Sequence, residues 1–332
     1  AEDTDTEEYD PHVILHEFGH YLEFRFSRSD NFGGPHALGD LLDLRVAFSE
    51  GWATAFAGLA LGDPVYRDAG GPQQGGAFVF DVEGGANSAP GWFSEQSVHE
   101  LIYDFVDTAI DGNDILSYPF SAVWSVMTGP VRTTRALTSI FPFMNRFKRA
   151  NASDQATLDL LASSQSIGSI TTDFGENETN DAGSADVLPV YTPITVNGAP
   201  VNLCSTDDFT SDVTGSVNKL GSRRFLRFTP PSAGTATITM TATSIPAGEY
   251  ADPDFWVYRL GLITGSEGQP SAACEDVGAV GWEPGNCVET ASIPVVASEH
   301  ILDAYEWTNA DRLPPEFSPI GRTCFDITVT QP

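Results

Sequence analysis

The residues best suited to chemistry in this 332-residue chain lie near its start, in the segment His16-Glu17-Phe18-Gly19-His20. On a helix, residues four apart lie one above the other, so the imidazoles of His16 and His20 would point to one place. Two such imidazoles make half of a tetrahedral zinc site. Glu17 lies about one hundred degrees around the helix from His16, close enough to reach a water molecule at the metal without taking a ligand position. The spacing therefore predicts a zinc ion held in part by His16 and His20, with Glu17 as a general base.

A zinc site of this kind needs a third protein ligand. The metzincin arrangement would place a histidine six residues after His20 and a glycine three residues after it, but Phe26 and Glu23 occupy those places. We therefore favour a carboxylate. Glu50 lies among small and apolar residues of a predicted second helix, and a metal cation would remove the cost of burying its charge. The alternative ligands in the intervening segment are His36, Asp40 and Asp43.

A resemblance to a known family rests on two runs, His16-Glu17-Phe18-Gly19-His20 and Ser49-Glu50-Gly51-Trp52-Ala53. Residues 13–53 are similar to the gluzincin group of zinc metallopeptidases, to which thermolysin-like and aminopeptidase-like enzymes belong. The resemblance implies that His16, His20 and Glu50 hold zinc, while Glu17 activates water for attack on a peptide carbonyl. The chain departs from the thermolysin-like pattern in two ways. There are 29 residues between His20 and Glu50, and Thr54, rather than an acid, stands four residues after Glu50.

The function expected from these motifs is zinc-dependent hydrolysis of a peptide or protein substrate, by an endopeptidase rather than an exopeptidase. A second electrophile would assist the oxyanion. The candidates for that role are Arg45, His99, Tyr103 and Tyr118. The alternative function is that of a secreted binding or adhesion protein with a structural or vestigial zinc site. A structural zinc is closed by a fourth protein ligand, whereas a catalytic zinc keeps an open position.

Helical patterns dominate the first half of the chain and would position these side chains. Asp10-Pro11 supplies an N-cap and a proline at the first helical position, and the residues from Val13 to Leu22 then give a broad apolar face. A second helix, rich in small residues, is predicted over 44–60, and a third over 94–108. A Gly/Pro/Gln-rich loop is predicted over 69–91. Three further helices are predicted near 119–128, 133–149 and 153–165.

The residues before this first helix form a short acidic segment without a pattern, because only fifteen residues precede His16. The resemblance to zincins implies a β-sheet ahead of the active-site helix, with an edge strand that binds the substrate backbone. We therefore expect that a portion upstream of residue 1 is missing.

The pattern changes after Ser166. Residues 171–194 are predicted to form an acidic linker, because they are rich in Asp, Glu, Asn, Gly and Thr. We expect a multidomain α and β chain, with an α-rich zincin-like catalytic region over 1–170 and an all-β sandwich domain over 195–332. Short alternating runs predict strands over 224–228, 235–243, 255–258, 292–297, 301–305 and 325–330.

Parts of this second half resemble the pre-peptidase C-terminal type of β-sandwich found on secreted bacterial proteases. The resemblance is carried by residues 224–228, 252–258 and 324–330.

The four cysteines all lie in the second half, at Cys204, Cys274, Cys287 and Cys324, and none forms a CxxC pair. An even number of cysteines in one region indicates two disulfides and an oxidising compartment. We predict the pairs Cys204–Cys324, joining the two ends of a domain, and Cys274–Cys287, across a Gly-rich loop. The alternative is four buried free thiols. The pattern therefore favours a secreted protein.

The chain carries 16 basic and 46 acidic residues, a formal net charge of −30. A charge of this sign repels nucleic-acid backbones and anionic lipid, so we expect no nucleic-acid partner. No stretch approaches the roughly 18 apolar residues that a membrane span requires. We expect a secreted monomer.

Calcium is a second cation that the acidic residues could hold. The run Asp107 to Asp114 lacks the oxygen ligands of an EF-hand loop, which favours an ordinary helix-ending turn there. The linker is richer in hard oxygen ligands, so calcium binding and plain solvation are both open for it. Its candidate ligands are Asp173, Glu176, Asn177, Glu178, Asn180 and Asp181.

Overall fold

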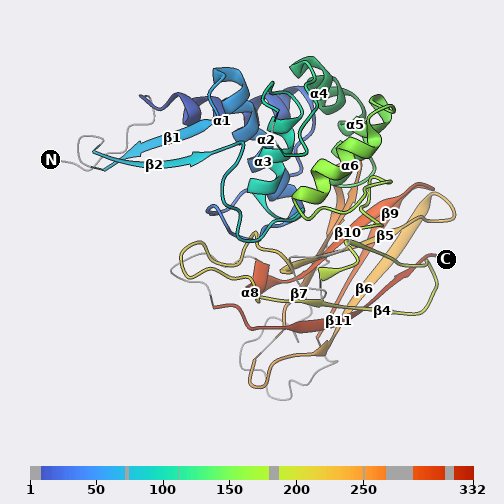
Figure 1. Ribbon diagram of the computed structural model, residues 1–332. Helices are drawn as coiled ribbons and strands as arrows, with labels where there is room; N and C mark the ends of the chain where they lie inside the picture. Colours follow the sequence, from blue (N-terminus) through green and yellow to red (C-terminus); the bar gives the residue numbers. More distant parts are fainter. Residues whose placement is uncertain are drawn as a thin grey trace. The chain divides into compact units, whose positions relative to one another are not determined.

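The computed structural model contains helices and sheets and describes residues 9–71, 75–110, 112–178, 187–249, 251–266, 287–310 and 318–332 (Figure 1). The chain separates into two compact units. The first comprises Ala1–Phe32, Leu44–Thr134 and Thr138–Gly183. The second comprises Gly33–Asp43, Arg135–Leu137 and Ser184–Pro332.

The first unit is built mainly of helices. They are α1 (Pro11–Phe26), α2 (Leu44–Leu61), α3 (Glu95–Asp104), α4 (Phe120–Val126), the π-helical turn η3 (Met127–Val131), α5 (Ile140–Ala150) and α6 (Gln155–Ser164). The helix predicted over 133–149 begins only at Ile140. Thr134 and Thr138 precede it in non-helical backbone and form hydrogen bonds with Asp173 and Asp30 instead. Because the Thr138 N–H donates to Asp30 rather than to a carbonyl one turn earlier in the chain, this tertiary hydrogen bond replaces a helical one.

Helix α1 begins as its sequence predicts, with Asp10 in extended backbone and Pro11 at the first helical position. The face it buries differs from the prediction. Ile14, Phe18 and Tyr21, expected on the apolar packing face, are 47%, 45% and 52% exposed. The buried side of α1 instead carries Gly19 and the polar residues His12 and Glu23. The part of α1 that packs on α2 therefore includes polar side chains, which a metal site requires.

Glycines allow the helices of this unit to approach closely. A Cβ added at Gly19 would lie 3.0 Å from the Ala53 Cα of α2, so α1 and α2 meet almost backbone to backbone. A Cβ added at Gly51 would lie 2.5 Å from Val98 Cβ on α3. Helix α2 is thus held between α1 and α3, and it is buried along most of its length. This packing places Glu50 next to α1.

A hairpin that the sequence did not predict follows α2. Strands β1 (Val65–Gly70) and β2 (Gly76–Asp81) pair in antiparallel register, and β2 lies inside the segment expected to be a loop. Tyr66 and Phe80 stack across the hairpin with ring centroids 4.9 Å apart. Tyr66 also packs with Ala57 and Tyr103 in a small hydrophobic core. Cross-strand aromatic pairs stabilise short strands that lack a strong alternating pattern.

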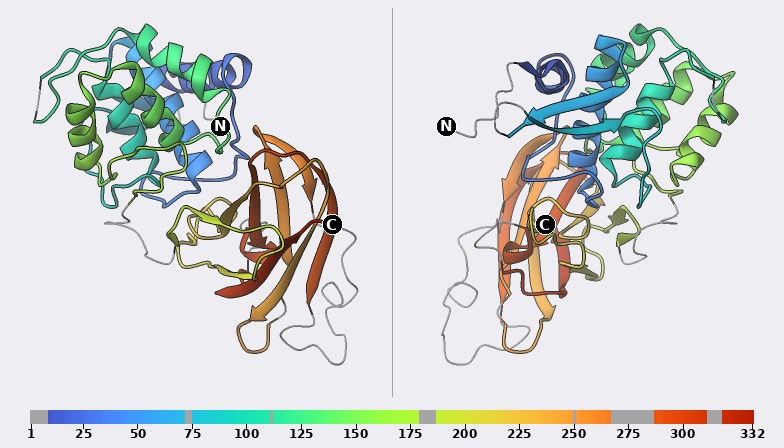
Figure 2. Two further views of the ribbon diagram at one scale, coloured as in Figure 1. Left: turned by 90° about the vertical axis from the view of Figure 1, so that its right-hand side faces the viewer. Right: turned by 60° about the vertical axis from the view of Figure 1, so that its left-hand side comes forward.

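The second unit consists mainly of strands, seen from two further directions in Figure 2. One sheet has the order β3 (Tyr191–Pro193), β5 (Arg223–Phe228), β10 (His300–Glu306), β7 (Pro253–Arg259) and β8 (Leu262–Ser266). The other has the order β4 (Val201–Ser205), β11 (Thr323–Thr330), β6 (Gly234–Ser244) and β9 (Val288–Val295). A short helix, α8 (Trp307–Ala310), follows β10. Alternating residues of both sheets contribute to one hydrophobic core.

The predicted disulfide between Cys204 and Cys324 is present. The two residues lie opposite each other on β4 and β11. Cys287 is also disulfide-bonded and is fully buried in the core. Cys274, the partner predicted for it, lies outside the described residues.

The segment predicted as a linker contains a buried carboxylate. Asp173 accepts hydrogen bonds from Thr134 at 2.7 Å and Asn145 at 2.5 Å, and it forms an ion pair with Arg146 at 2.5 Å. Burial opposes ionisation of Asp173, but these partners hold its pKa below the ordinary value. The Asp173 carboxylate therefore serves an ion pair within the first unit. Asn180 and Asp181, two further calcium candidates, lie outside the described residues.

Candidate metal centre

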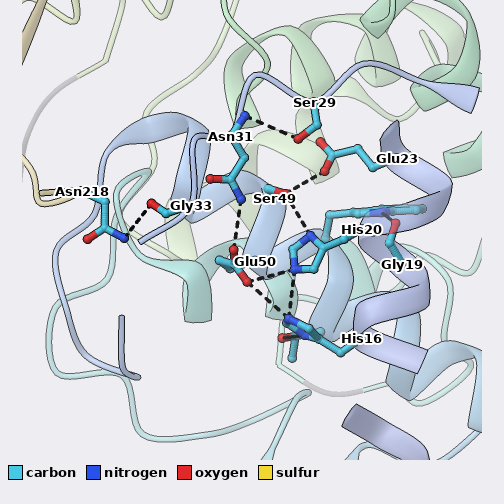
Figure 3. Close-up of polar contacts among 12 residues, drawn as sticks. His16, Gly19, His20, Glu23, Ser29, Asn31, Gly33, Ser49, Glu50 and Asn218 are labelled. Carbon is cyan, nitrogen blue, oxygen red and sulfur yellow. Dashed lines mark hydrogen bonds and ion pairs between the residues drawn. The ribbon is translucent and has the colours of Figure 1, made fainter. Parts of the chain in front are cut away.

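Three side chains predicted to bind metal converge at the α1–α2 contact (Figure 3). The Nε2 atoms of His16 and His20 are 3.1 Å apart. Glu50 Oε2 lies 3.2 Å from His16 Nε2 and 3.1 Å from His20 Nε2. The three ligand atoms therefore form a nearly equilateral triangle, with two corners from one turn of α1 and the third from α2.

The dimensions of this triangle suit a small divalent cation. In a tetrahedral zinc site with bonds of about 2.0–2.1 Å, neighbouring ligand atoms are about 3.3 Å apart. Two imidazole nitrogens and one carboxylate oxygen are also a donor set that zinc prefers. Within the described residues, these three are the His, Cys, Asp or Glu side chains grouped closely enough to hold an ion. Such a set leaves one position open to solvent or substrate.

Hydrogen bonds on the outer side of each ring indicate which nitrogen carries the proton. His16 Nδ1 lies 3.1 Å from Thr54 Oγ1, and His20 Nδ1 lies 3.1 Å from Ser49 Oγ. The Ser49 hydroxyl donates its own proton to Glu23 at 2.7 Å, so we assign it as the acceptor from His20 Nδ1–H. With the same assignment at Thr54, both Nε2 atoms carry lone pairs that face each other and a carboxylate. That arrangement is repulsive unless a metal cation or a proton lies between them.

The orientation of Glu50 is also set by a hydrogen bond. Its Oε1 accepts from Asn31 Nδ2 at 3.1 Å, which leaves Oε2 directed at the two imidazoles. Asn31 follows a tightly held turn after α1. In that turn Arg28 forms an ion pair with Asp30 at 2.9 Å, and Asp30 Oδ2 accepts from the backbone N–H of Thr138 at 2.8 Å. The turn therefore presents the Asn31 amide from a fixed position.

Burial and charge shift two pKa values at the site. Glu23 is 1% exposed, and burial raises its pKa to about 7, although the Ser49 hydrogen bond and the charge of His20 oppose this. Burial lowers the pKa of His20, but the hydrogen bond and charge of Glu50, with the charges of Glu23 and Glu17, outweigh burial and raise it. The charges of Glu50, Glu23 and Glu17 therefore favour a positive charge at the imidazoles.

The proposed base, Glu17, is exposed on α1. It follows His16 directly in the helix, and its negative charge contributes to the raised pKa of His20. An exposed carboxylate beside the ligand pair can exchange protons with water and with a substrate. Glu17 therefore has the accessibility that a general base needs.

The alternative ligands do not join this group. His36, Asp40 and Asp43 lie in the segment Gly33–Asp43, which belongs to the second unit. There Asp40 accepts a hydrogen bond from Thr214 at 2.8 Å and lies 3.5 Å from Lys219 Nζ.

The four oxyanion candidates are differently placed. Arg45 is 1% exposed, and its guanidinium lies over the Phe32 ring at 4.5 Å. The Tyr118 hydroxyl donates to Asp154 at 2.5 Å. Tyr103 packs in the hairpin core, where burial raises its pKa to about 12. These three side chains already have structural partners.

His99 is the remaining candidate. It is 1% exposed on α3 and stacks on Phe80 with ring centroids 5.6 Å apart. Burial, with the charge of His16, lowers the pKa of His99 to about 3, so the ring is neutral. Neither ring nitrogen has a hydrogen-bond partner among the described residues.

Four residues that orient the ligands were not predicted from the sequence. Ser49 lies one residue before Glu50 on the same helix, and Thr54 lies four residues after it. Residues four apart on a helix are neighbours, so the sequence could have predicted that Thr54 lies near Glu50. Glu23 stands three residues after His20, on the same side of α1. Asn31 lies in a loop, and no local pattern connects it to Glu50.

Comparisons with known proteins find similarity at the level of structure. No protein-family model matches the chain, and no curated protein matches it. Among solved structures, the pre-peptidase C-terminal domain of a collagenase from Bacillus anthracis is similar over 42% of this chain and 93% of that chain. The identity is 8% and the TM-score 0.24. In the described part of the chain, no helix is both long enough and apolar enough to cross a bilayer.

Proposed function

We propose that the protein is a zinc metallopeptidase whose metal is held by His16, His20 and Glu50. The observation that carries the proposal is the triangle of ligand atoms, with sides of 3.1–3.2 Å. The motif resemblance to gluzincins supports the same ligand set. The comparisons with known proteins add no support for a peptidase.

The residues at the site have distinct roles in peptide hydrolysis. A bound zinc ion would supply Lewis acidity for water and for the substrate carbonyl. Glu17 would accept the proton of the attacking water and then transfer it to the nitrogen of the leaving amine. The two imidazoles and Glu50, fixed by their outer hydrogen bonds, would keep their positions during this transfer.

A catalytic site is favoured over a structural one. A structural zinc needs a fourth protein ligand. Within the described residues, the group of possible ligands contains three members. We therefore propose catalysis rather than the alternative function of a binding protein with a closed metal site.

We also propose that the protein acts outside the cytosol. The Cys204–Cys324 disulfide is typical of proteins in oxidising compartments. The net charge of −30 is compatible with an extracellular protein and keeps it soluble.

The substitution Glu17→Gln tests the proposed function. We expect it to lower kcat for an internally quenched peptide by at least about 100-fold, because the amide cannot accept the proton. Zinc content should stay at one per chain, since Glu17 is not a ligand. In the parent protein, a chelator should abolish activity and added zinc should restore it. A blocked peptide and a free-amine peptide, assayed side by side, distinguish endopeptidase from aminopeptidase action.

The matched control is Glu249→Gln, which neutralises an exposed glutamate of the second unit. It should hydrolyse the peptide at the parent rate. If Glu17→Gln is as active as the parent protein, Glu17 is not the base and the proposed mechanism is wrong.

A further inference from the structure

The side chain of Ser49 connects the two ligand helices next to the candidate metal centre. It lies on α2, one residue before Glu50, and its hydroxyl is in contact with two residues of α1. His20 Nδ1 is 3.1 Å from Ser49 Oγ, and Ser49 Oγ is 2.7 Å from Glu23 Oε2 (Figure 3). A continuous hydrogen-bonded chain therefore runs from the His20 ring to a buried carboxyl group.

The direction of the protons in this chain follows from the chemistry of its members. An ionised carboxylate only accepts hydrogen bonds, and a serine hydroxyl has a single proton to donate. Once Ser49 donates to Glu23, its oxygen can interact with the His20 ring only as an acceptor. In the neutral ring, His20 Nδ1 must then carry the proton, which leaves the Nε2 lone pair directed toward Glu50 and His16. Without an acceptor at position 23, the Ser49 hydroxyl is free to donate to Nδ1, which would put the ring proton on Nε2.

We propose that Glu23 is a positioning residue that acts through Ser49 to hold His20 in the tautomer that binds metal. The inference rests on the proposed zinc site. It adds a residue that lies outside the motif and does not contact the metal. His16 differs from His20 in this respect. The described partner of its outer nitrogen, Nδ1, is the neutral hydroxyl of Thr54.

The burial of Glu23 separates this role from a merely structural one. Glu23 is 1% exposed, and burying a carboxyl group is costly. An apolar residue of similar size at position 23 removes this desolvation cost. A purely structural role predicts that zinc affinity changes only as much as stability does. A positioning role predicts that zinc binding weakens while the metal-free protein stays as stable or becomes more stable.

The experiment compares Glu23→Leu, Glu23→Gln and Ser49→Ala with the parent chain. Zinc affinity is measured by competition with a chromophoric chelator, and the stability of the metal-free protein by thermal unfolding. We expect Glu23→Leu and Ser49→Ala to bind zinc 10- to 100-fold more weakly. Glu23→Gln keeps an amide oxygen that can accept from Ser49, so its affinity should lie between those of Glu23→Leu and the parent. The melting temperature of metal-free Glu23→Leu should equal or exceed that of the parent.

The visible absorption of the cobalt-substituted protein provides a spectroscopic readout. Its ligand-field bands report the geometry at the metal, so they should change in Glu23→Leu and Ser49→Ala. The control is Ser97→Ala, which removes a buried serine hydroxyl of α3 that accepts hydrogen bonds from Asn87 and Gly91. Its cobalt spectrum and zinc affinity should match those of the parent.

Unchanged zinc affinity in Glu23→Leu overturns the inference. If Glu23→Leu does not fold, unchanged affinity in Ser49→Ala overturns it equally. A parent chain that binds no zinc contradicts the proposed function itself, which separates the two failures.

Discussion

Each ligand atom at the candidate centre is oriented by a different side chain. Thr54 binds the outer nitrogen of His16, Ser49 that of His20, and Asn31 the outer oxygen of Glu50. Such outer hydrogen bonds fix ring tautomers and carboxylate rotation, and their loss typically lowers metal affinity.

Asn31 offers the simplest test of this orientation, because it contacts Glu50 from a loop. We expect Asn31→Ala to lower zinc affinity about tenfold, since the Glu50 carboxylate gains freedom to rotate. The measurement is a zinc titration against a competing chelator. Asn202→Ala, at an exposed asparagine that donates to Asp326, is the matched control and should leave the affinity unchanged. Equal affinities in the two variants would show that Asn31 does not orient Glu50.

The residues proposed as ligands could be predicted from the sequence because helical spacing is local information. His16 and His20 follow from the i, i+4 rule. Glu50 was favoured over the alternative ligands because a metal cation would remove the cost of burying its charge among small and apolar residues. The outer residues could not be derived in this way. Glu23 was noted only as a departure from another family's pattern, and its contact with Ser49 depends on how α1 packs against α2.

At the scale of elements, helix α1 illustrates the limit of periodicity. Apolar residues lie around much of its circumference, so the sequence predicted a broad apolar face but not the side that is buried. The informative residue was Gly19, whose lack of a side chain allows the backbone of α2 to approach. The β1–β2 hairpin was missed because its strands are short and lie beside Gly-rich sequence.

Gly19 therefore provides a test of the helix contact. In Gly19→Ala, the new Cβ would lie 3.0 Å from Ala53 Cα, and α1 would have to move away from α2. We expect a loss of about 1–3 kcal/mol in the free energy of unfolding, from overpacking, and weaker zinc binding because two ligands move relative to the third. Chemical denaturation and a zinc titration measure the two effects.

Gly129→Ala is the control for helix propensity, because a Cβ at Gly129 in η3 would meet no atom within 4 Å. It should leave zinc binding unchanged and alter stability by no more than about 1 kcal/mol. If Gly19→Ala behaves in the same way, close helix approach is not what places the ligands.

At the scale of the whole molecule, most of the segment that joins α1 to α2 belongs to the second unit. Residues Gly33–Asp43 group with it, Leu42 forms a bridge with Lys219, and Lys219 Nζ donates to the Pro35 carbonyl at 3.0 Å. These residues, which pack within the second unit, account for the long stretch of sequence between the two ligand helices. Contacts between residues so far apart in the chain leave no local pattern, which is why the sequence did not predict them.

The stability of the second unit should depend on pH through Glu306. This side chain is fully buried, and burial raises its pKa from 4.5 to about 8, with hydrogen bonds from Asp252 and Thr308 opposing the shift. The folded state therefore keeps a proton that the unfolded state has lost. The stabilising contribution is complete below pH 4.5 and is lost as the pH rises through 8.

We expect the free energy of unfolding to fall by about 1.4 kcal/mol per pH unit between these limits. Denaturant titrations of the metal-free protein at a series of pH values measure this slope. Glu306→Gln, which cannot titrate, should flatten it. A slope that is the same in Glu306→Gln and in the parent would assign the pH dependence to other groups.

The most direct test of the zinc site is zinc-edge X-ray absorption of the protein loaded with one equivalent of zinc. The account predicts two imidazole nitrogens and oxygen ligands at about 2.0–2.1 Å, with one imidazole lost in His16→Ala and one in His20→Ala. A spectrum without two imidazoles, or one that neither substitution changes, would contradict it.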